Sequence, residues 1–244
     1  MTTKRENTTK KKKQTSVSKI SETAIETALN ALASDPRIPP DTNTPRGQIF
    51  AAATKLFAEH GYRGTNTRAI AQAAGAKQVM IHYYFGTKEL LYEAVLKHEG
   101  IKMLAVIFEA NNNHKSPAEK LVESPIRLMS VLHDNPQWAS LMRREIANGA
   151  VHLRRALKDI SELGPLGAGL RFYDVYNEAV AEGKVMDLPA DAVCEFLLAI
   201  GYSAIYLAPL ISMINERDFQ DETVWEEWKL TLGTILKRGL LLDQ

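Results

Sequence analysis

Apolar residues recur every three or four positions along most of the chain, which is the spacing of one face of an α-helix. No segment alternates apolar and polar residues as a half-buried strand does. The pattern therefore predicts an all-α protein. We expect helices over residues 45–61, 68–74, 78–85, 88–112, 117–134, 136–148, 150–163, 166–183, 190–214 and 221–242, with an extra helix near 20–33.

The helices between residues 45 and 85 carry start and stop signals. Thr44 and Asn66 are short polar residues suited to cap a helix, and Pro45 suits the first helical position. Helix-terminating glycines follow at Gly61, Gly75 and Gly86. Residues 66–85 thus form two short helices joined by a turn, a helix-turn-helix whose second helix lies in the DNA major groove. Its expected core is Leu56, Phe57, Ile70, Ala74, Ile81 and Phe85.

Residues 45–98 resemble the DNA-binding domain of TetR-family transcriptional regulators. The resemblance is carried by Phe57, Gly61, Tyr62, Thr65, residues 67–71, Ala74, Gly75 and residues 84–91. It implies a three-helix DNA-binding domain over 45–100 and a helical ligand-binding and dimerisation domain over 101–244. The implied function is that of a homodimeric repressor, released from a palindromic operator in double-stranded DNA by a small-molecule effector.

The resemblance also places individual residues at the DNA. Thr67 and Lys88 match positions that bind phosphate, and Lys77 stands where serine or threonine is usual. Arg68 can bind guanine and Gln78 can bind adenine in the major groove. The full set of expected DNA contacts is Thr67, Arg68, Lys77, Gln78, Val79, Met80, Tyr83, Tyr84 and Lys88.

The net charge of +1 hides an uneven distribution. Residues 1–19 contain seven Lys and Arg and one Glu, and residues 45–100 contain seven basic and four acidic residues. Residues 101–244 contain fifteen basic and twenty acidic residues. A polyanion partner fits this distribution. The tail at 1–19 is expected either to add phosphate contacts or to be a solvated extension, and residues 20–44 are expected to hold the extra helix and a proline-rich linker.

The C-terminal domain offers few sequence signals for its ligand. Apolar walls with polar groups suggest effector contacts, although Met and aromatic residues at helical spacing more often belong to the core than to a pocket. The candidates are Met103, Met129, Trp138, Met142, Phe172, Tyr173, Tyr176 and Tyr202.

Two segments near the C-terminus indicate an interface. Residues 196–215 carry no charge and suit a helix buried between its own domain and a partner. A second stripe holds two tryptophans, which are enriched in protein interfaces. The expected dimer contacts are Tyr206, Trp225, Trp228, Leu232 and Ile235. Two alternatives remain open: a helical scaffold that binds other proteins through the tryptophan stripe, and a membrane-tethered regulator that uses residues 196–215.

No catalytic constellation is present in the sequence. The glycine-containing segment 164–169 lacks the lysine of a phosphate-binding loop, and the six histidines show no metal-binding spacing. We therefore expect neither an enzyme nor a cofactor or metal site. A single cysteine, Cys194, and the absence of a secretory signal fit a reducing, bacterial-type cytoplasm and no membrane partner.

Overall fold

The computed structural model describes residues 30, 35–39, 41–111, 115–158 and 167–242. Side chains at 101–111, 167–171 and 204–205 lie outside this description. The basic tail at 1–19 and the extra helix near 20–33 also lie outside the described residues, apart from residue 30, so both stay predictions.

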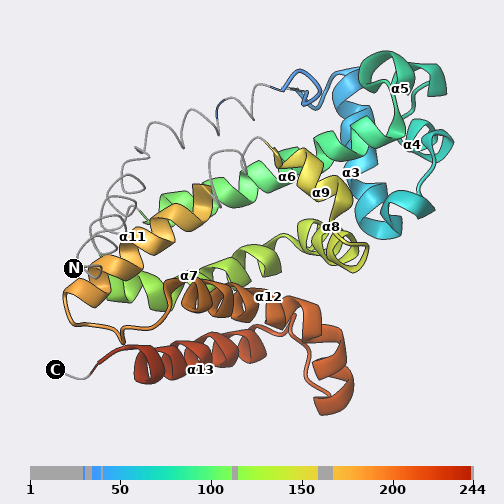
Figure 1. Cartoon of the computed structure of the whole chain (residues 1–244). Helices are drawn as coiled ribbons and strands as arrows, with labels where there is room; N and C mark the ends of the chain where they lie inside the picture. The colour runs from blue at the N-terminus through green and yellow to red at the C-terminus, as the bar shows by residue number, and fades with distance from the viewer. Residues whose placement is uncertain (1–29, 31–34, 40, 112–114, 159–166, 243–244) are drawn as a thin grey trace, which may run out of the picture.

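The described chain is all-α, as the apolar spacing predicts (Figure 1). Its one extended pairing is an isolated antiparallel bridge between Val185 and Leu241. The predicted helix at 150–163 begins at Val151 and is interrupted at Leu157. The helices are α3 (Pro45–Gly64), α4 (Thr67–Ala73), α5 (Gln78–Phe85), α6 (Lys88–Asn111), α7 (Pro117–Asp134), α8 (Pro136–Ala147), α9 (Val151–Ala156), α11 (Gly167–Ala181), α12 (Ala190–Asn215) and α13 (Glu222–Leu240).

Local capping explains where several helices begin. The Thr44 side chain accepts a hydrogen bond from Gly47 N at 3.0 Å, directly before the proline that opens α3. Ser116 and Glu119 form a reciprocal capping box at the start of α7. The Asp221 carboxylate accepts from the first backbone N–H groups of α13, and these hydrogen bonds lower its pKa. The starts of α3, α7 and α13 are therefore determined by residues close in sequence.

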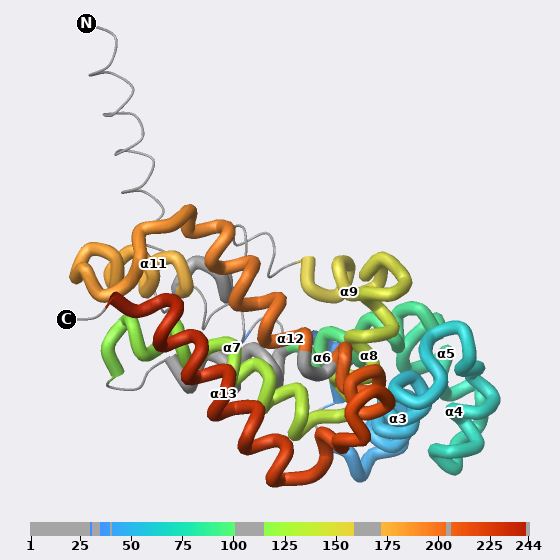
Figure 2. The backbone as a smooth tube through the Cα atoms, turned by 90° about the horizontal axis from the view of Figure 1, so that it is seen from below, coloured from blue at the N-terminus to red at the C-terminus, as the bar shows by residue number. Residues whose placement is uncertain are grey.

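The helices pack around two apolar cores. One core combines α3–α6 with α8, α9 and two leucines of α7, Leu128 and Leu132, and the other combines α7 with α11, α12 and α13. Figures 1 and 2 place α3, α4 and α5 at one end of the molecule and α11 at the other, with the long α6 running between them. Because α6 starts just after α5, the small helical domain and the larger bundle share one continuous helix.

Helix α12 approaches α7 closely and then bends. Gly201 lies so near α7 that a Cβ added there would be 2.8 Å from Leu128 Cδ2. The segments Ala190–Ser203 and Tyr206–Asn215 are inclined by 55°, and the second contains Pro209. No single helix of the described residues has the length and apolar character to span a membrane; only these two bent segments taken together reach those limits.

The structure corrects the predicted interface stripe of α13. Trp225 and Leu232 are 3% and 7% exposed and pack inside their own chain. The Trp225 ring stacks on His133 of α7 with ring centroids 4.1 Å apart, and Trp228 lies against Phe219. Trp225 and Leu232 are therefore covered by their own chain and have little surface left for a partner. Of the predicted stripe, Ile235 alone is largely exposed, at 62%.

The contact at Gly201 yields a stability prediction. In Gly201→Ala the new methyl group meets the Leu128 side chain, so α7 and α12 have to separate or Leu128 has to leave its rotamer. We expect a loss of ~1–3 kcal/mol in the free energy of unfolding, as overpacked cores show. The control is Gly239→Ala in α13, where no atom lies within 4 Å of an added Cβ. That control should not destabilise the protein, and equal midpoints for the two variants in denaturant would contradict the close packing.

Candidate nucleic-acid interface

Helices α4 and α5 form the predicted helix-turn-helix. The Asn66 side chain caps α4 by accepting from Ala69 N at 2.8 Å. Gly75 in the turn has a φ of 62°, a left-handed conformation that suits glycine, and Gly86 closes α5 with a φ of 77°. Lys77 precedes α5 and makes no capping hydrogen bond through its side chain. Asn66 therefore starts α4, Gly75 shapes the turn between α4 and α5, and Gly86 ends α5.

Helix α5 has one buried face and one exposed face. Ile81 and Phe85 are 0% and 3% exposed and join the apolar core beneath the helix. On the opposite face, Val79 and Tyr83 are 67% and 81% exposed. Apolar and aromatic side chains projecting from a helix anchored by its other face are available to a partner surface. The geometry is that of a helix presented to a groove.

Several polar groups beside this face are already oriented. Gln78 Nε2 donates to Thr67 Oγ1 at 2.8 Å, so the amide of α5 is held by the first residue of α4. Its second N–H and its carbonyl oxygen remain to face a base edge. His82, one turn along from Gln78, is also exposed and its Nδ1 lies 2.9 Å from Gly86 O. His82 is absent from the DNA contacts predicted from the sequence, although its i+4 spacing from Gln78 places it on the same side of α5.

Lys88, the first residue of α6, contacts the end of α3 through its side chain. Its Nζ donates to Tyr62 O and Thr65 O, both at 2.9 Å, and lies 4.1 Å from the centre of the Tyr62 ring. Thr65 Oγ1 in turn donates to Gly61 O at 2.9 Å. Since an ammonium group has three N–H donors, one remains for a phosphate. Lys88 therefore has a structural role that the sequence did not indicate, beside its predicted phosphate contact.

The structure brings the predicted DNA contacts together on one end of the molecule, with different exposure. Met80 and Tyr84 are partly buried against the core, so only part of each side chain can face a groove. Thr67 and Lys88 are also half-buried. The exposed members are Arg68, Lys77, Gln78, Val79 and Tyr83.

The larger bundle contacts this domain through the carbonyl end of α3. Ser140 Oγ of α8 donates to Ala58 O at 2.7 Å, and Arg144 Nη2 donates to Glu59 O at 2.7 Å. These carbonyls lie just before Gly61, where α3 turns sharply with a φ of 70°. Helix α8 therefore supplies side-chain hydrogen-bond donors to two carbonyl oxygens beside this turn.

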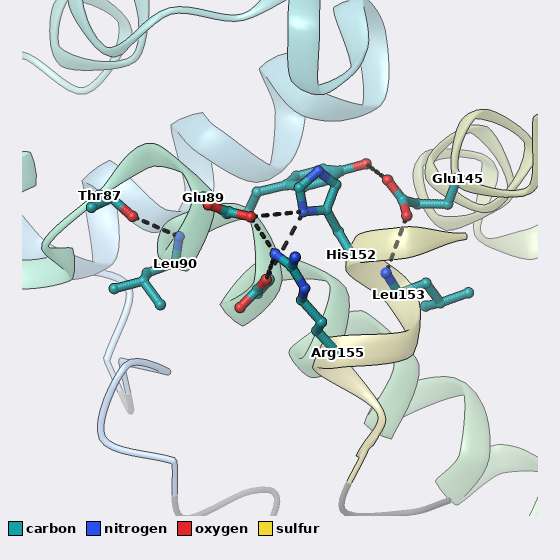
Figure 3. Close-up of polar contacts among 9 residues, drawn as sticks. Thr87, Glu89, Leu90, Glu145, His152, Leu153 and Arg155 are labelled. Carbon is teal, nitrogen blue, oxygen red and sulfur yellow. Dashed lines mark hydrogen bonds and ion pairs between the residues drawn. The ribbon is translucent and has the colours of Figure 1, made fainter. Parts of the chain in front are cut away.

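A buried carboxylate links α8 to α6 and α9. Glu145 is 3% exposed and accepts a 2.9 Å hydrogen bond from Tyr92 OH and a 3.1 Å hydrogen bond from Leu153 N (Figure 3). Burial and then the Glu145 charge raise the pKa of Tyr92, which keeps its hydroxyl protonated as the donor. The sequence analysis missed both residues, because nothing local marks partners so far apart in the chain.

The predicted effector contacts do not gather in one place. Met129, Phe172 and Tyr176 belong to the core of α7 and α11–α13, while Trp138, Met142 and Tyr202 belong to the core at the DNA-binding end. The Tyr173 hydroxyl donates to Asp191, and the side chain of Met103 lies outside the described residues.

The Tyr176 hydroxyl forms hydrogen bonds with the loop that connects α11 and α12. Its hydroxyl lies 2.9 Å from the carbonyl oxygens of Met186 and Leu188 and accepts from Leu188 N at 2.8 Å. These contacts satisfy the buried hydroxyl within the chain, so Tyr176 has a structural role that accounts for its polar group.

Tyr206 is different, because its buried hydroxyl has no hydrogen-bond partner among the described residues. Burial and the neighbouring Tyr202 raise the pKa of Tyr206 to about 12, so the hydroxyl stays protonated at neutral pH. It is predicted as a dimer contact, and a partner group that accepts a hydrogen bond would satisfy it.

Comparison with known proteins agrees with this geometry. Residues 49–95 match the family model of bacterial regulatory proteins, tetR family. The chain is 22% identical over 205 residues to the HTH-type transcriptional repressor NicS of Pseudomonas putida, a match that covers 80% of this chain and 92% of NicS. It is 26% identical over 197 residues to the HTH-type transcriptional regulator RutR of Escherichia coli K12, covering 79% and 88% of the two chains.

A solved structure shares the whole fold. The ketosteroid transcriptional regulator KstR2 of Mycobacterium tuberculosis superposes with a TM-score of 0.62 at 18% identity, over 85% of this chain and all of that chain. The helix-turn-helix and its family match lead to one conclusion: residues 49–95 form a DNA-binding domain of the tetR family, in a chain that is similar over about four fifths of its length to transcriptional regulators that carry this domain.

Proposed function

We propose that this regulator is a repressor whose α5 helix enters the major groove of its operator and reads base pairs there. The observation that carries the proposal is the two-faced α5, with Ile81 and Phe85 anchored below and Val79 and Tyr83 exposed above. The B-DNA major groove admits an α-helix, and base edges there distinguish all four base pairs. A scaffold that binds proteins would have no need for a second helix oriented by a glycine turn.

The contacts divide by chemistry. Gln78 is positioned to donate to adenine N7 and accept from N6, since Thr67 already orients its amide. Arg68 can bind guanine bidentately, and Val79 can contact a thymine methyl group. Lys77 and the third N–H of Lys88 suit phosphate, as does the Tyr83 hydroxyl. Phosphate contacts would fix the position of the helix, and base contacts would give specificity.

Two copies of the chain would place two α5 helices in successive major grooves, about 34–36 Å apart on a palindrome. The second half of α12 exposes Leu207, Leu210, Met213 and Ile214, and α13 exposes Leu230 and Ile235. An apolar surface of this extent beside the bundle favours a helix-to-helix interface between copies. The dimer contact is therefore assigned to the exposed side of α12 and α13 rather than to Trp225 and Leu232.

A small-molecule effector would act through the contacts that join the bundle to the DNA-binding domain. It has to bind one arrangement of these contacts more tightly than the other, since equal affinity shifts no equilibrium. Ser140 and Arg144 of α8 and the Tyr92–Glu145 pair would transmit the change, because they connect directly to α3 and α6. A shift of α8 would then change the spacing of the two recognition helices.

Lys77 tests the phosphate contacts. Because its side chain caps nothing, Lys77→Ala removes a charge without removing a helix cap. Affinity should fall about equally on operator and random DNA, and the salt dependence should flatten by about 0.9 per lost contact. The matched control is Lys237→Ala, an exposed lysine of α13. Fluorescence anisotropy at several salt concentrations measures the affinity and its salt dependence. A loss of affinity for the operator alone would contradict a phosphate contact by Lys77.

Gln78 tests base reading. Gln78→Ala should relax the preference at one base pair of each half-site by ~1–3 kcal/mol while preserving binding to random DNA. Affinities for a set of singly substituted operators, found first by selection from genomic DNA, provide the measurement. Gln137→Ala, at an exposed glutamine of α8, serves as the control. If the variant loses the same affinity on every sequence, Gln78 does not read a base.

Ile235 tests the dimer surface. Since Ile235 is exposed within one chain, Ile235→Glu should leave the protomer folded but bury an unpaired charge in the dimer. We expect the dimer to weaken by more than ~2 kcal/mol, and operator affinity to fall because one half-site remains. The control is Ile146→Glu, at a similarly exposed isoleucine of α8. Sedimentation analysis that finds an unchanged dimer would refute this interface.

A further inference from the structure

Three side chains from two helices converge where α9 lies against the start of α6. Glu89 and Glu93 are one turn apart on α6, and His152 reaches them from α9 (Figure 3). One ligand atom from each residue lies within 4.8 Å of the other two. His152 Nδ1 is 3.7 Å from Glu89 Oε1 and 3.9 Å from Glu93 Oε1. The sequence analysis expected no metal site, because these residues show no motif spacing.

The imidazole nitrogen that faces the carboxylates is buried without a hydrogen-bond partner in the described part of the chain. Aromatic packing holds the ring instead, with ring centroids 4.6 Å from Tyr62 and 5.3 Å from Tyr92. An unsatisfied buried polar atom costs free energy, so a group that binds at this nitrogen would be stabilised there. The partner has to lie between the nitrogen and the two carboxylate oxygens.

The spacing of these atoms suits a metal ion better than a direct hydrogen bond. Zinc lies about 2.0–2.2 Å from nitrogen and oxygen ligands, which puts two ligands of a tetrahedron about 3.4 Å apart. The observed separations of 3.7 and 3.9 Å exceed this by a few tenths of an ångström. A small rotation of the glutamate side chains would close the difference.

Arg155 is the cation that now balances the two carboxylates. Its Nη1 contacts Glu89 and lies 3.6 Å from Glu93. The Arg155 side chain is 58% exposed, so it can turn into solvent when another cation arrives. Glu89 and Glu93 would otherwise repel each other at their i,i+4 spacing. The two carboxylates are therefore stabilised by a positive charge, and a bound metal ion could replace the Arg155 guanidinium in that role.

We propose that Glu89, Glu93 and His152 form a binding site for a divalent transition-metal ion that joins α9 to the start of α6. One imidazole and two carboxylates suit zinc and neighbouring first-row ions, and three protein ligands leave a position for water. Magnesium, which requires octahedral oxygen ligands, fits this set poorly.

Zinc alone is the probe, titrated into the metal-free full-length protein against a chromophoric chelator, without DNA. We expect one ion per chain, with magnesium failing to compete. Glu93→Gln, which keeps the side-chain shape, and His152→Ala should each lower zinc affinity at least tenfold. Arg155→Ala should raise zinc affinity several-fold, because it removes the competing cation. His60→Ala is the matched control, since His60 lies 3.7 Å from Glu59 on α3 and the described residues offer no third ligand there.

The zinc affinity of Arg155→Ala distinguishes a metal site from a cluster of ion pairs. If the three residues only pair with Arg155, zinc will not saturate at one ion per chain, and Arg155→Ala will lower the melting temperature with no gain in zinc affinity. Equal zinc affinity in Glu93→Gln, His60→Ala and the unmodified protein would likewise overturn the proposal. Should His152→Ala fail to fold, the isosteric Glu93→Gln decides. Because no DNA is present, the result is independent of operator binding.

Discussion

The buried carboxylate of Glu145 fixes the geometry on which the rest of the molecule depends. A carboxylate loses its hydration when it is buried, so it is tolerated only where hydrogen bonds replace the water. Tyr92 OH of α6 and Leu153 N of α9 supply two such hydrogen bonds. Removing one partner of a buried charge typically costs ~3–5 kcal/mol, far more than a surface contact. Three helices are therefore held at one point by a group that cannot easily be left unpaired.

Much of the fold could be predicted from the sequence because the signals are local. Apolar spacing and caps such as Thr44 and Asn66 depend on neighbours within a few residues, and the helices follow them closely. The sequence could not show which surface covers an apolar stripe. Trp225 and Leu232 have the same spacing whether they face α7 or a second chain, and the structure places them against their own chain.

The candidate site likewise has a part that could be predicted from local sequence and a part that could not. The recognition helix and its exposed residues Gln78 and Tyr83 follow from a motif of adjacent residues. The second role of Lys88 depends on carbonyl oxygens of Tyr62 and Thr65, which only the folded chain brings near. Glu89, Glu93 and His152 meet for the same reason. Contacts between distant segments are set by packing, and one sequence without its relatives carries little record of them.

The bend in α12 separates a buried first segment from a largely exposed second segment. Residues such as Val193 and Leu197 in the first segment are buried in the chain's own core, whereas Met213 and Ile214 in the second are mostly exposed. Under the proposed dimer contact, changes to the second segment would alter which chains pair with one another without rebuilding the core. A designer seeking two variants that assemble only with each other would recode residues 206–215 and keep the first segment intact. The exposed segment of α12 would thus allow orthogonal pairing at a place separate from the buried core.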